Sequence, residues 1–237
     1  MYKYKLNLPV VTLAWLVPGV LVIAPNTYAQ PLEPNLKAKP AFDLALQNRL
    51  DATVLVFSTT TWNSGLGPLE LVGTNEFDAN SKQKVNQRIY DSNGSYTEYP
   101  AGFVDYHPQH QHIHFNDYAL YELQPVNAPG ASSRTGAKTT FCIMDTTRVN
   151  RHLPGAPKRA VYKTCGTKQG ISVGWGDTYG SHLAGQEVDF TGNPPGNYRL
   201  KITVDPKDNL IETNEADNES QVCFNVTNSV ITPISCP

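Results

Sequence analysis

The sequence has no long run of like charge, no stripe of lysine and arginine, and no glycine-rich phosphate loop. Nucleic acids are bound through basic surfaces, and nucleotides are commonly held by glycine-rich loops, so neither class of partner is expected. The formal net charge is only −2 at pH 7. This slight acidity favours a cationic substrate, but weakly.

Helical periodicity is also missing, and no internal repeat is present. Residues 198–204 instead alternate apolar and polar side chains, which is typical of a half-buried strand. Residues 52–61 are apolar and rich in valine, phenylalanine and threonine, which indicates a buried strand. The Asn93-Gly94 pair predicts a tight hairpin in which both turn residues take a positive φ.

Gly, Pro and Asn separate these strands from several others, and 237 residues suffice for one sizeable core. The sequence therefore predicts a single mostly β domain, an antiparallel β-sandwich core with long irregular loops and little helix. Further strands are expected at residues 69–72, 88–90, 96–99, 139–144 and 222–226, and along the histidine-rich segment as far as residue 123.

The N-terminus has the composition of an export signal. Lys3 and Lys5 precede a mostly apolar stretch over residues 6–24, and residues 27–29 offer a small-residue cleavage site. Prolines interrupt the apolar stretch, so a removed signal peptide is favoured over a membrane anchor, and no stable membrane insertion is expected after its removal. Three segments follow: a signal peptide at 1–29, an extended linker at 30–41 and the folded domain at 42–237.

Cysteine is scarce, with four residues: Cys142, Cys165, Cys223 and Cys236. In an exported chain these are expected to pair, and four cysteines allow three connectivities.

Histidine is concentrated in one place, since four of the six histidines lie within residues 107–114. His110, His112 and His114 occupy every second position, so in a strand they share one face. Imidazole is a common ligand of copper, zinc, iron and nickel, which makes a transition-metal site the leading interpretation. A flat strand would separate the outer two by roughly 13 Å, so the strand must bend or another ligand must contribute. The alternative is a solvated histidine-rich strand or an incidental metal-binding tract.

Residues 106–114, Tyr-His-Pro-Gln-His-Gln-His-Ile-His, resemble the copper-binding segment of the lysyl oxidase family, Trp-His-x-Cys-His-Gln-His-Tyr-His. The resemblance implies that His110, His112 and His114 bind copper. Gln109 replaces the family's cysteine, and one further downstream histidine of the family has no counterpart.

Two more segments carry the same resemblance. Residues 138–146, Lys-Thr-Thr-Phe-Cys-Ile-Met-Asp-Thr, match the family's Phe-Cys-x-x-Asp-Thr with a lysine four residues before the cysteine, and residues 169–179 resemble Gln-Gly-Leu-Ser-x-Gly-Cys-Tyr-Asp-Thr-Tyr. The resemblance implies that Lys138 and Tyr179 combine into lysyl tyrosylquinone. Taken singly, the two would be interpreted as a solvated lysine and a core aromatic residue.

The activity implied is oxidative deamination of a primary amine, either protein lysine or a small amine. Molecular oxygen reoxidises the cofactor, and the products are an aldehyde, ammonia and hydrogen peroxide. Asp177 is a candidate for the proton-abstracting base by its proximity to Tyr179 in the sequence. The family's C-terminal disulfide maps onto Cys223 and Cys236, which leaves Cys142 and Cys165 for each other.

The resemblance extends over residues 42–236 and includes a calcium site. The implied calcium ligands are Asp43, Leu44, Glu212, Asn214, Asp217 and Asn218. Carboxylate, amide and backbone oxygens suit calcium, but an asparagine-rich turn explains the second half of this set equally well.

These observations predict a secreted or periplasmic, copper- and quinone-dependent amine oxidase. The rival hypothesis is an exported β-sandwich that binds a metal for sequestration or adhesion, because such a protein needs the histidines but not Lys138 or Tyr179.

Overall fold

The structure is a computed structural model that describes residues 29–108 and 111–237. The predicted signal peptide lies almost wholly outside these ranges, as does His110. Within them, no helix is long and apolar enough to span a membrane.

The described chain is built from short antiparallel strands, which confirms the mostly β prediction. The strands are β1 (Pro31–Leu32), β2 (Leu36–Ala38), β3 (Phe42–Asn48), β4 (Thr53–Asn63), β5 (Leu69–Phe77), β6 (Gln83–Asp91), β7 (Tyr96–His107), β8 (His112–Phe115), β9 (Ala119–Asn127), β10 (Arg134–Thr135), β11 (Thr147–Arg148), β12 (Lys168–Ile171), β13 (Trp175–Tyr179), β14 (Glu187–Asp189), β15 (Gly196–Val204), β16 (Glu219–Thr227) and β17 (Val230–Ile234). One 3-10 turn, η1 (Glu215–Asp217), is the sole helical element among the described residues.

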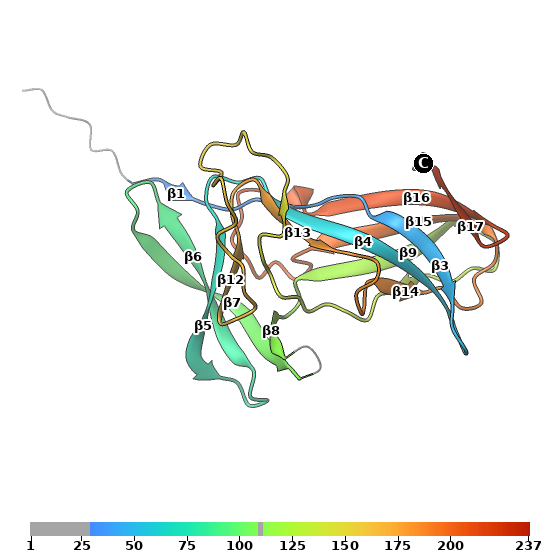
Figure 1. The fold of residues 1–237 in the computed structure, drawn as a ribbon, viewed down its shortest axis with the longest axis horizontal. Helices are drawn as coiled ribbons and strands as arrows, with labels where there is room; N and C mark the ends of the chain where they lie inside the picture. The colour runs from blue at the N-terminus through green and yellow to red at the C-terminus, as the bar shows by residue number, and fades with distance from the viewer. Residues whose placement is uncertain (1–28, 109–110) are drawn as a thin grey trace, which may run out of the picture.

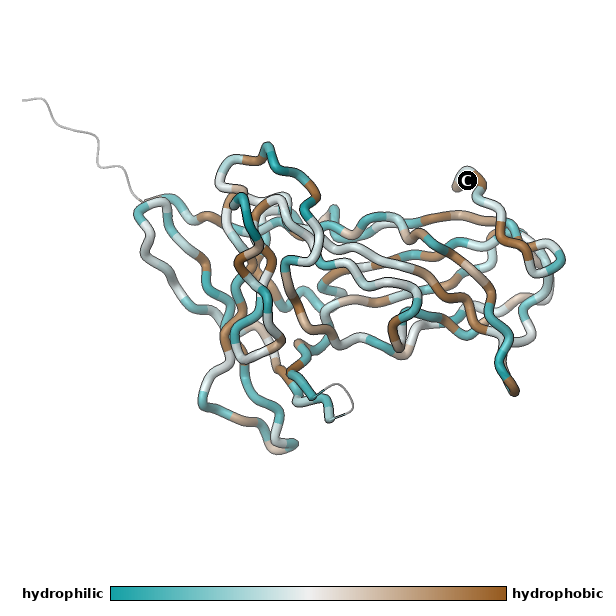
Figure 2. Tube along the Cα trace, in the orientation of Figure 1, coloured by the Kyte–Doolittle hydropathy of each residue, from teal (hydrophilic) through white to brown (hydrophobic). Residues whose placement is uncertain are grey.

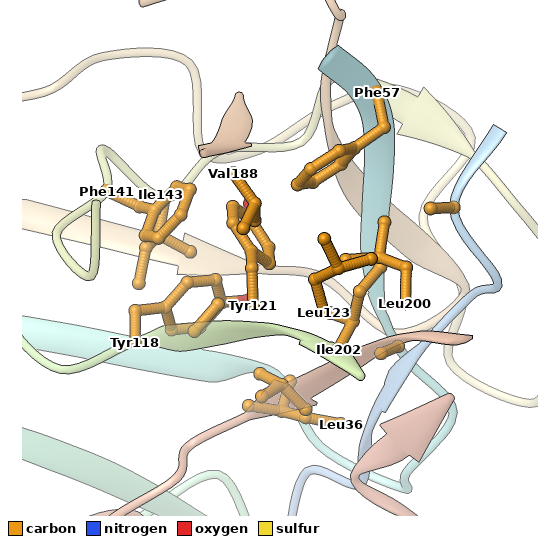
Figure 3. Close-up of a cluster of buried hydrophobic side chains, with 14 of the residues drawn as sticks. Leu36, Phe57, Tyr118, Tyr121, Leu123, Phe141, Ile143, Val188, Leu200 and Ile202 are labelled. Atoms are coloured by element: carbon orange, nitrogen blue, oxygen red, sulfur yellow. The ribbon is translucent and has the colours of Figure 1, made fainter. Parts of the chain in front are cut away.

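Two sheets pack face to face and enclose the core (Figure 1). One sheet has the order β10-β9-β15-β16-β17, and the other has the order β11-β13-β4-β14, with β2 and β3 also paired to β4. One buried cluster between the sheets includes Phe57 of β4, Leu123 of β9, and Leu200 and Ile202 of β15 (Figure 3). Every second residue of β15 from Tyr198 is buried, as the alternation predicted. Figure 2 shows hydrophobic residues concentrated along these strands.

A third sheet, of order β12-β5-β6-β7-β8, projects from one end of the sandwich (Figure 1). Its β6–β7 hairpin forms where Asn93-Gly94 predicted it, with Tyr90 opposite Tyr96. Of the two turn residues only Gly94 takes a positive φ, at 87°. The loop is longer than a two-residue turn, and the glycine alone supplies the left-handed residue that it needs.

The segment predicted as an extended linker is extended, and it is also paired. β1 joins β6 and β2 joins β4, and Leu36 is fully buried. The start of the described chain therefore connects the projecting sheet to the sandwich.

Two strand predictions are wrong. Residues 139–144 make a single bridge, between Phe141 and Phe115, instead of a strand. The strand predicted to run from the histidines to residue 123 is interrupted after Phe115, because Asp117 takes a positive φ of 54° in a turn before β9. That turn lets the chain pass from the projecting sheet into the sandwich.

Both implied disulfides are present, Cys142–Cys165 and Cys223–Cys236. The second joins β16 to a residue just beyond β17, and the first joins two irregular segments beside the histidines.

Candidate active site

The histidines lie where the chain reverses between β7 and β8. Gln111 takes a positive φ of 56°, and its amide donates to the carbonyl of His107 at 2.8 Å. β8 therefore starts at His112, which lies opposite His107. The bend that three shared ligands required is present at Gln111, and His110 precedes it, outside the described residues. Of the three histidines, the structure therefore describes His112 and His114, both in β8.

The side chains of His112 and His114 converge. Their Nε2 atoms are 2.9 Å apart, and two nitrogens that each lie about 2 Å from one ion would be about 3 Å apart. His114 is almost fully buried, its Nδ1 lies 3.3 Å from the hydroxyl of Thr140, and the ring of His107 stacks on it at 4.8 Å. A partner on the second ring nitrogen is what orients a metal-binding imidazole.

Lys138 and Tyr179 meet beside this pair, although 41 residues separate them in the sequence. The Lys138 Nζ lies 4.8 Å from the centre of the Tyr179 ring and 5.0 Å from that of Phe141. Tyr179 ends β13, packs edge-on against Phe141 at 5.1 Å, and donates its hydroxyl proton to the Cys142 carbonyl at 2.7 Å. Burial lowers the pKa of Lys138, although the charge of Asp177 opposes the shift. Burial raises the pKa of Tyr179.

Asp177 is buried in β13, two residues before Tyr179. Burial raises its pKa to about 7, and two hydrogen bonds act against that shift. The amide of Met144 and the hydroxyl of Thr146 each donate to the carboxylate at 3.2 Å. Thr146 in turn accepts from the Thr178 amide at 2.7 Å, so the hydroxyl holds two successive residues of β13. A carboxyl group with this pKa can take up a proton at neutral pH.

One cavity of about 480 Å³ unites these groups. His112, His114, Lys138, Asp177 and Tyr179 all line it. The rest of its wall is largely apolar and comprises Met144, Leu183, Ala184, Thr146, Thr178 and the Cys142–Cys165 disulfide. Such a site can hold a metal beside an amine, a phenol and a base.

The sequence interpretation missed Thr140, Thr146 and the turn over residues 183–186. Thr146 lies in the quoted Phe-Cys-x-x-Asp-Thr segment, so its position was a usable signal. Nothing in the sequence indicated Thr140 or the turn, because both act through contacts that the fold creates.

The structure does not bring all six of the calcium ligands named from the sequence together, because Asp43 and Leu44 lie apart from Glu212. Asp43 accepts a hydrogen bond from Ser58 at 3.0 Å, while Glu212 accepts one from the Leu36 amide. Phe42 pairs with Ser58 and Leu36 with Asn63, five residues further along β4. Five residues of a strand span roughly 16 Å, too far for one ion.

Asn35 and Leu36 take the place expected of Asp43 and Leu44. The amide group of Asn35 donates to Asp217 at 3.3 Å, and that of Asn218 donates to Glu212 at 3.2 Å. Among the described residues, the side-chain oxygens of Asn35 and Asn218 are buried without a hydrogen-bond partner. Burial raises the pKa of Glu212 to about 8. Asn214 instead caps η1 through the Ala216 amide. Oxygen atoms of this kind fit calcium.

Comparison with known proteins places these residues in context. A sequence model described as lysyl oxidase matches residues 78–236. Lysyl oxidase homolog 1 of Homo sapiens is 32% identical over 138 residues, which are 58% of this chain and 23% of that protein. Protein-lysine 6-oxidase of Homo sapiens is 32% identical over 115 residues, 48% of this chain and 26% of that protein. Lysyl oxidase homolog 3A of Danio rerio is 33% identical over 114 residues, 48% of this chain and 14% of that protein. The match thus spans about a quarter or less of the length of these relatives.

Proposed function

Because the chain belongs to the lysyl oxidase family, we propose that it is an exported, copper- and quinone-dependent amine oxidase. The observation that supports this most strongly is the 4.8 Å approach of the Lys138 amine to the Tyr179 ring, in one cavity with two histidines. A protein that merely sequesters metal has no use for that contact. The substrate would be a primary amine, carried by a protein lysine or a small molecule.

Copper would be held by His112 and His114, with His110 as the third ligand. The fit rests on the convergence of the two Nε2 atoms and on Thr140 beside the far nitrogen of His114. Imidazole donors without thiolate suit copper and also zinc, so the fit identifies the donor set and not the metal.

Lys138 and Tyr179 would form lysyl tyrosylquinone, which supplies an electrophilic carbonyl for the substrate amine and accepts two electrons from it. Two features of the chain favour formation of this cofactor. The Cys142 carbonyl holds the Tyr179 hydroxyl and so fixes the ring's orientation. Burial lowers the pKa of Lys138, which increases the fraction of neutral, nucleophilic amine.

Asp177 would remove the α-proton from the bound amine. Its pKa of about 7 makes it a base at neutral pH, and the Met144 amide and Thr146 hydroxyl keep it in place. Asp177 itself is almost fully buried, which limits its contact with water.

Calcium would bind where residues 212–218 meet the start of the described chain, through Glu212, Asp217 and Asn218 with Asn35 and the Leu36 carbonyl. Two disulfides accord with export to an oxidising compartment. The signal peptide at 1–29 remains part of the proposal.

An amine oxidase assay separates this proposal from the sequestering sandwich. Copper-loaded protein is expected to release hydrogen peroxide from peptidyl lysine or from small mono- and diamines. Lys138→Arg and Tyr179→Phe should abolish peroxide release while leaving bound copper unchanged, because neither side chain is assigned to the metal.

The matched controls remove the metal instead. His112→Ala and His114→Ala should lower both the copper content and the peroxide signal. Copper bound by the unmodified chain without peroxide from any amine would leave the sequestering sandwich as the better account.

A further inference from the structure

The turn over Leu183–Gln186 lies against the side chain of Lys138. The Gln186 amide donates to the Leu183 carbonyl at 3.1 Å, and Gly185, at the third position, has a φ of 79°. A positive φ at that position is typical of a type II turn. The carbonyl of Ala184 accepts a hydrogen bond from Lys138 Nζ at 3.4 Å.

Gly185 leaves room for the stem of Lys138. A Cβ atom at position 185 would lie 2.7 Å from Lys138 Cδ, 2.8 Å from its Cβ and 3.3 Å from its Cγ. Carbon atoms pack at about 3.5–4.0 Å, so the first two contacts are severe clashes. The Cβ of Lys138 is fixed by its own backbone, so a change of rotamer cannot relieve the second clash. Either the turn or the segment that carries Lys138 would have to move.

The turn itself is anchored at both ends. The Ser181 amide donates to the Ser58 hydroxyl at 2.9 Å. Gln186 is fully buried, accepts from the Thr59 hydroxyl at 3.0 Å, and its backbone carbonyl accepts from the Phe57 amide. These contacts tie the turn to β4, the central strand of its sheet. The surface on which Lys138 rests is therefore set by the sandwich.

We propose that Gly185 is a positioning residue for the cross-link between Lys138 and Tyr179. Its missing side chain lets the Lys138 stem lie flat on the turn, so that Nζ reaches the Tyr179 ring before any bond forms. This inference rests on the proposed function. Dioxygen is the oxidant in the cross-link: the phenol becomes a quinone with one added oxygen, one ring C–H is replaced by the bond to Nζ, and water and hydrogen peroxide are the reduced products.

Gly192 provides a matched control within the same chain. It occupies the third position of the turn Phe190–Asn193, with a φ of 76°, and a Cβ atom added there would have nothing within 4 Å. Gly185→Ala and Gly192→Ala therefore impose the same backbone strain, and only the first meets Lys138.

The test compares the rate at which copper and air join the peptides that carry Lys138 and Tyr179, measured by mass spectrometry. Gly192→Ala should match the unmodified chain, and Gly185→Ala should be roughly a hundredfold slower, as for a reacting atom displaced by about 1 Å. Bound copper should be equal in all three proteins. Equal cross-linking in Gly185→Ala would overturn the proposal while leaving the proposed function intact.

Melting temperatures provide a second test that needs no cofactor. Gly185→Ala should lower the melting temperature more than Gly192→Ala does, and the excess should disappear in a Lys138→Gly background, where the clashing stem is absent. An excess that persists in the Lys138→Gly background would overturn the proposal, whether or not a cross-link forms. An unmodified chain that forms no cross-link would count against the proposed function and the proposal together. If Gly185→Ala fails to fold in both backgrounds while Gly192→Ala folds, contact with Lys138 is not the cause and the proposal is wrong.

Discussion

At the scale of single residues, the site depends on groups kept out of water. Asp177 and Lys138 line the same cavity, and the surrounding protein buries much of each side chain. Burial raises the pKa of the Asp177 carboxyl group and lowers the pKa of the Lys138 amine. Both shifts move the pKa toward neutral pH. The carboxylate can then accept a proton, and a larger fraction of the amine is neutral and reactive.

The first residue-scale prediction concerns pH. If Asp177 is the base, it must be ionised, so amine oxidation should rise as the pH increases through about 7. Asp177→Asn should lower kcat by roughly a hundred- to ten-thousandfold, the range for loss of a general base. Asp51→Asn, an exposed change between β3 and β4, serves as the control and should alter neither the rate nor its pH dependence.

The raised pKa of Asp177 also makes the free energy of unfolding depend on pH. Between pH 3.8 and about 7 the folded chain keeps the Asp177 proton that the unfolded chain releases, so this residue's contribution to stability falls as the pH rises across that window.

An oxidation rate that is flat across pH 7, or an active Asp177→Asn protein, would show that another group is the base.

Sequence motifs predicted that Lys138 and Tyr179 belong to one site, although 41 residues separate them. Lys138 and Tyr179 were paired by their local motifs, and the structure places them in contact. The calcium set was less well predicted, because Asp43-Leu44 and Asn35-Leu36 both lie near the start of the domain. Only the pairing of β2 with β4 brings the second pair beside residue 212.

At the scale of elements, the site is made by turns as much as by strands. Gln111 ends the reversal before β8, Asp117 passes the chain on to β9, and both take a positive φ. Alternating hydrophobicity predicted β15, because one face of that strand is buried throughout. It could not predict the breaks at Gln111 and Asp117, because these follow from where three sheets meet. Residues 139–144 were assigned to a strand because their composition suits one. In the structure only Phe141 among them forms a β-bridge, with Phe115.

A prediction at this scale concerns the segment over residues 212–218. Calcium should raise the melting temperature by binding the folded chain, with a gain of about 2.7 kcal/mol at a hundred times the Kd, and a chelator should reverse it. Glu212→Gln should remove the response, because the Glu212 carboxylate accepts hydrogen bonds from the Leu36 amide and the Asn218 side chain and is the buried acidic group of this segment.

Asp43→Asn is the matched control for the calcium experiment. Asp43 lies beside Ser58, away from Glu212, so its replacement should leave the calcium response intact. A response that is lost in Asp43→Asn and kept in Glu212→Gln would restore the ligand set implied by the resemblance. If neither calcium nor a chelator changes the melting temperature, residues 212–218 form a structural turn and not a calcium site.

At the scale of the whole molecule, the cavity lies where the projecting sheet meets the sandwich. β8 supplies His112 and His114 from the projecting sheet, and β13 supplies Asp177 and Tyr179 from the sandwich (Figure 1). The Cys142–Cys165 disulfide lines the same cavity and links the segment after Lys138 to the loop before β12. The projecting sheet carries the proposed copper ligands and the sandwich carries Tyr179. The proposed cofactor can therefore form only when the projecting sheet and the sandwich are packed together.

In the proposed function, Lys138 and Tyr179 together form one cofactor. A peptide mass map of copper-loaded, air-exposed protein tests it most directly. We expect one cross-linked species that joins the two peptides, that hydrazines trap as a quinone adduct, and that is absent from Lys138→Arg and Tyr179→Phe. Recovery of separate, unmodified Lys138 and Tyr179 peptides at full yield would contradict it.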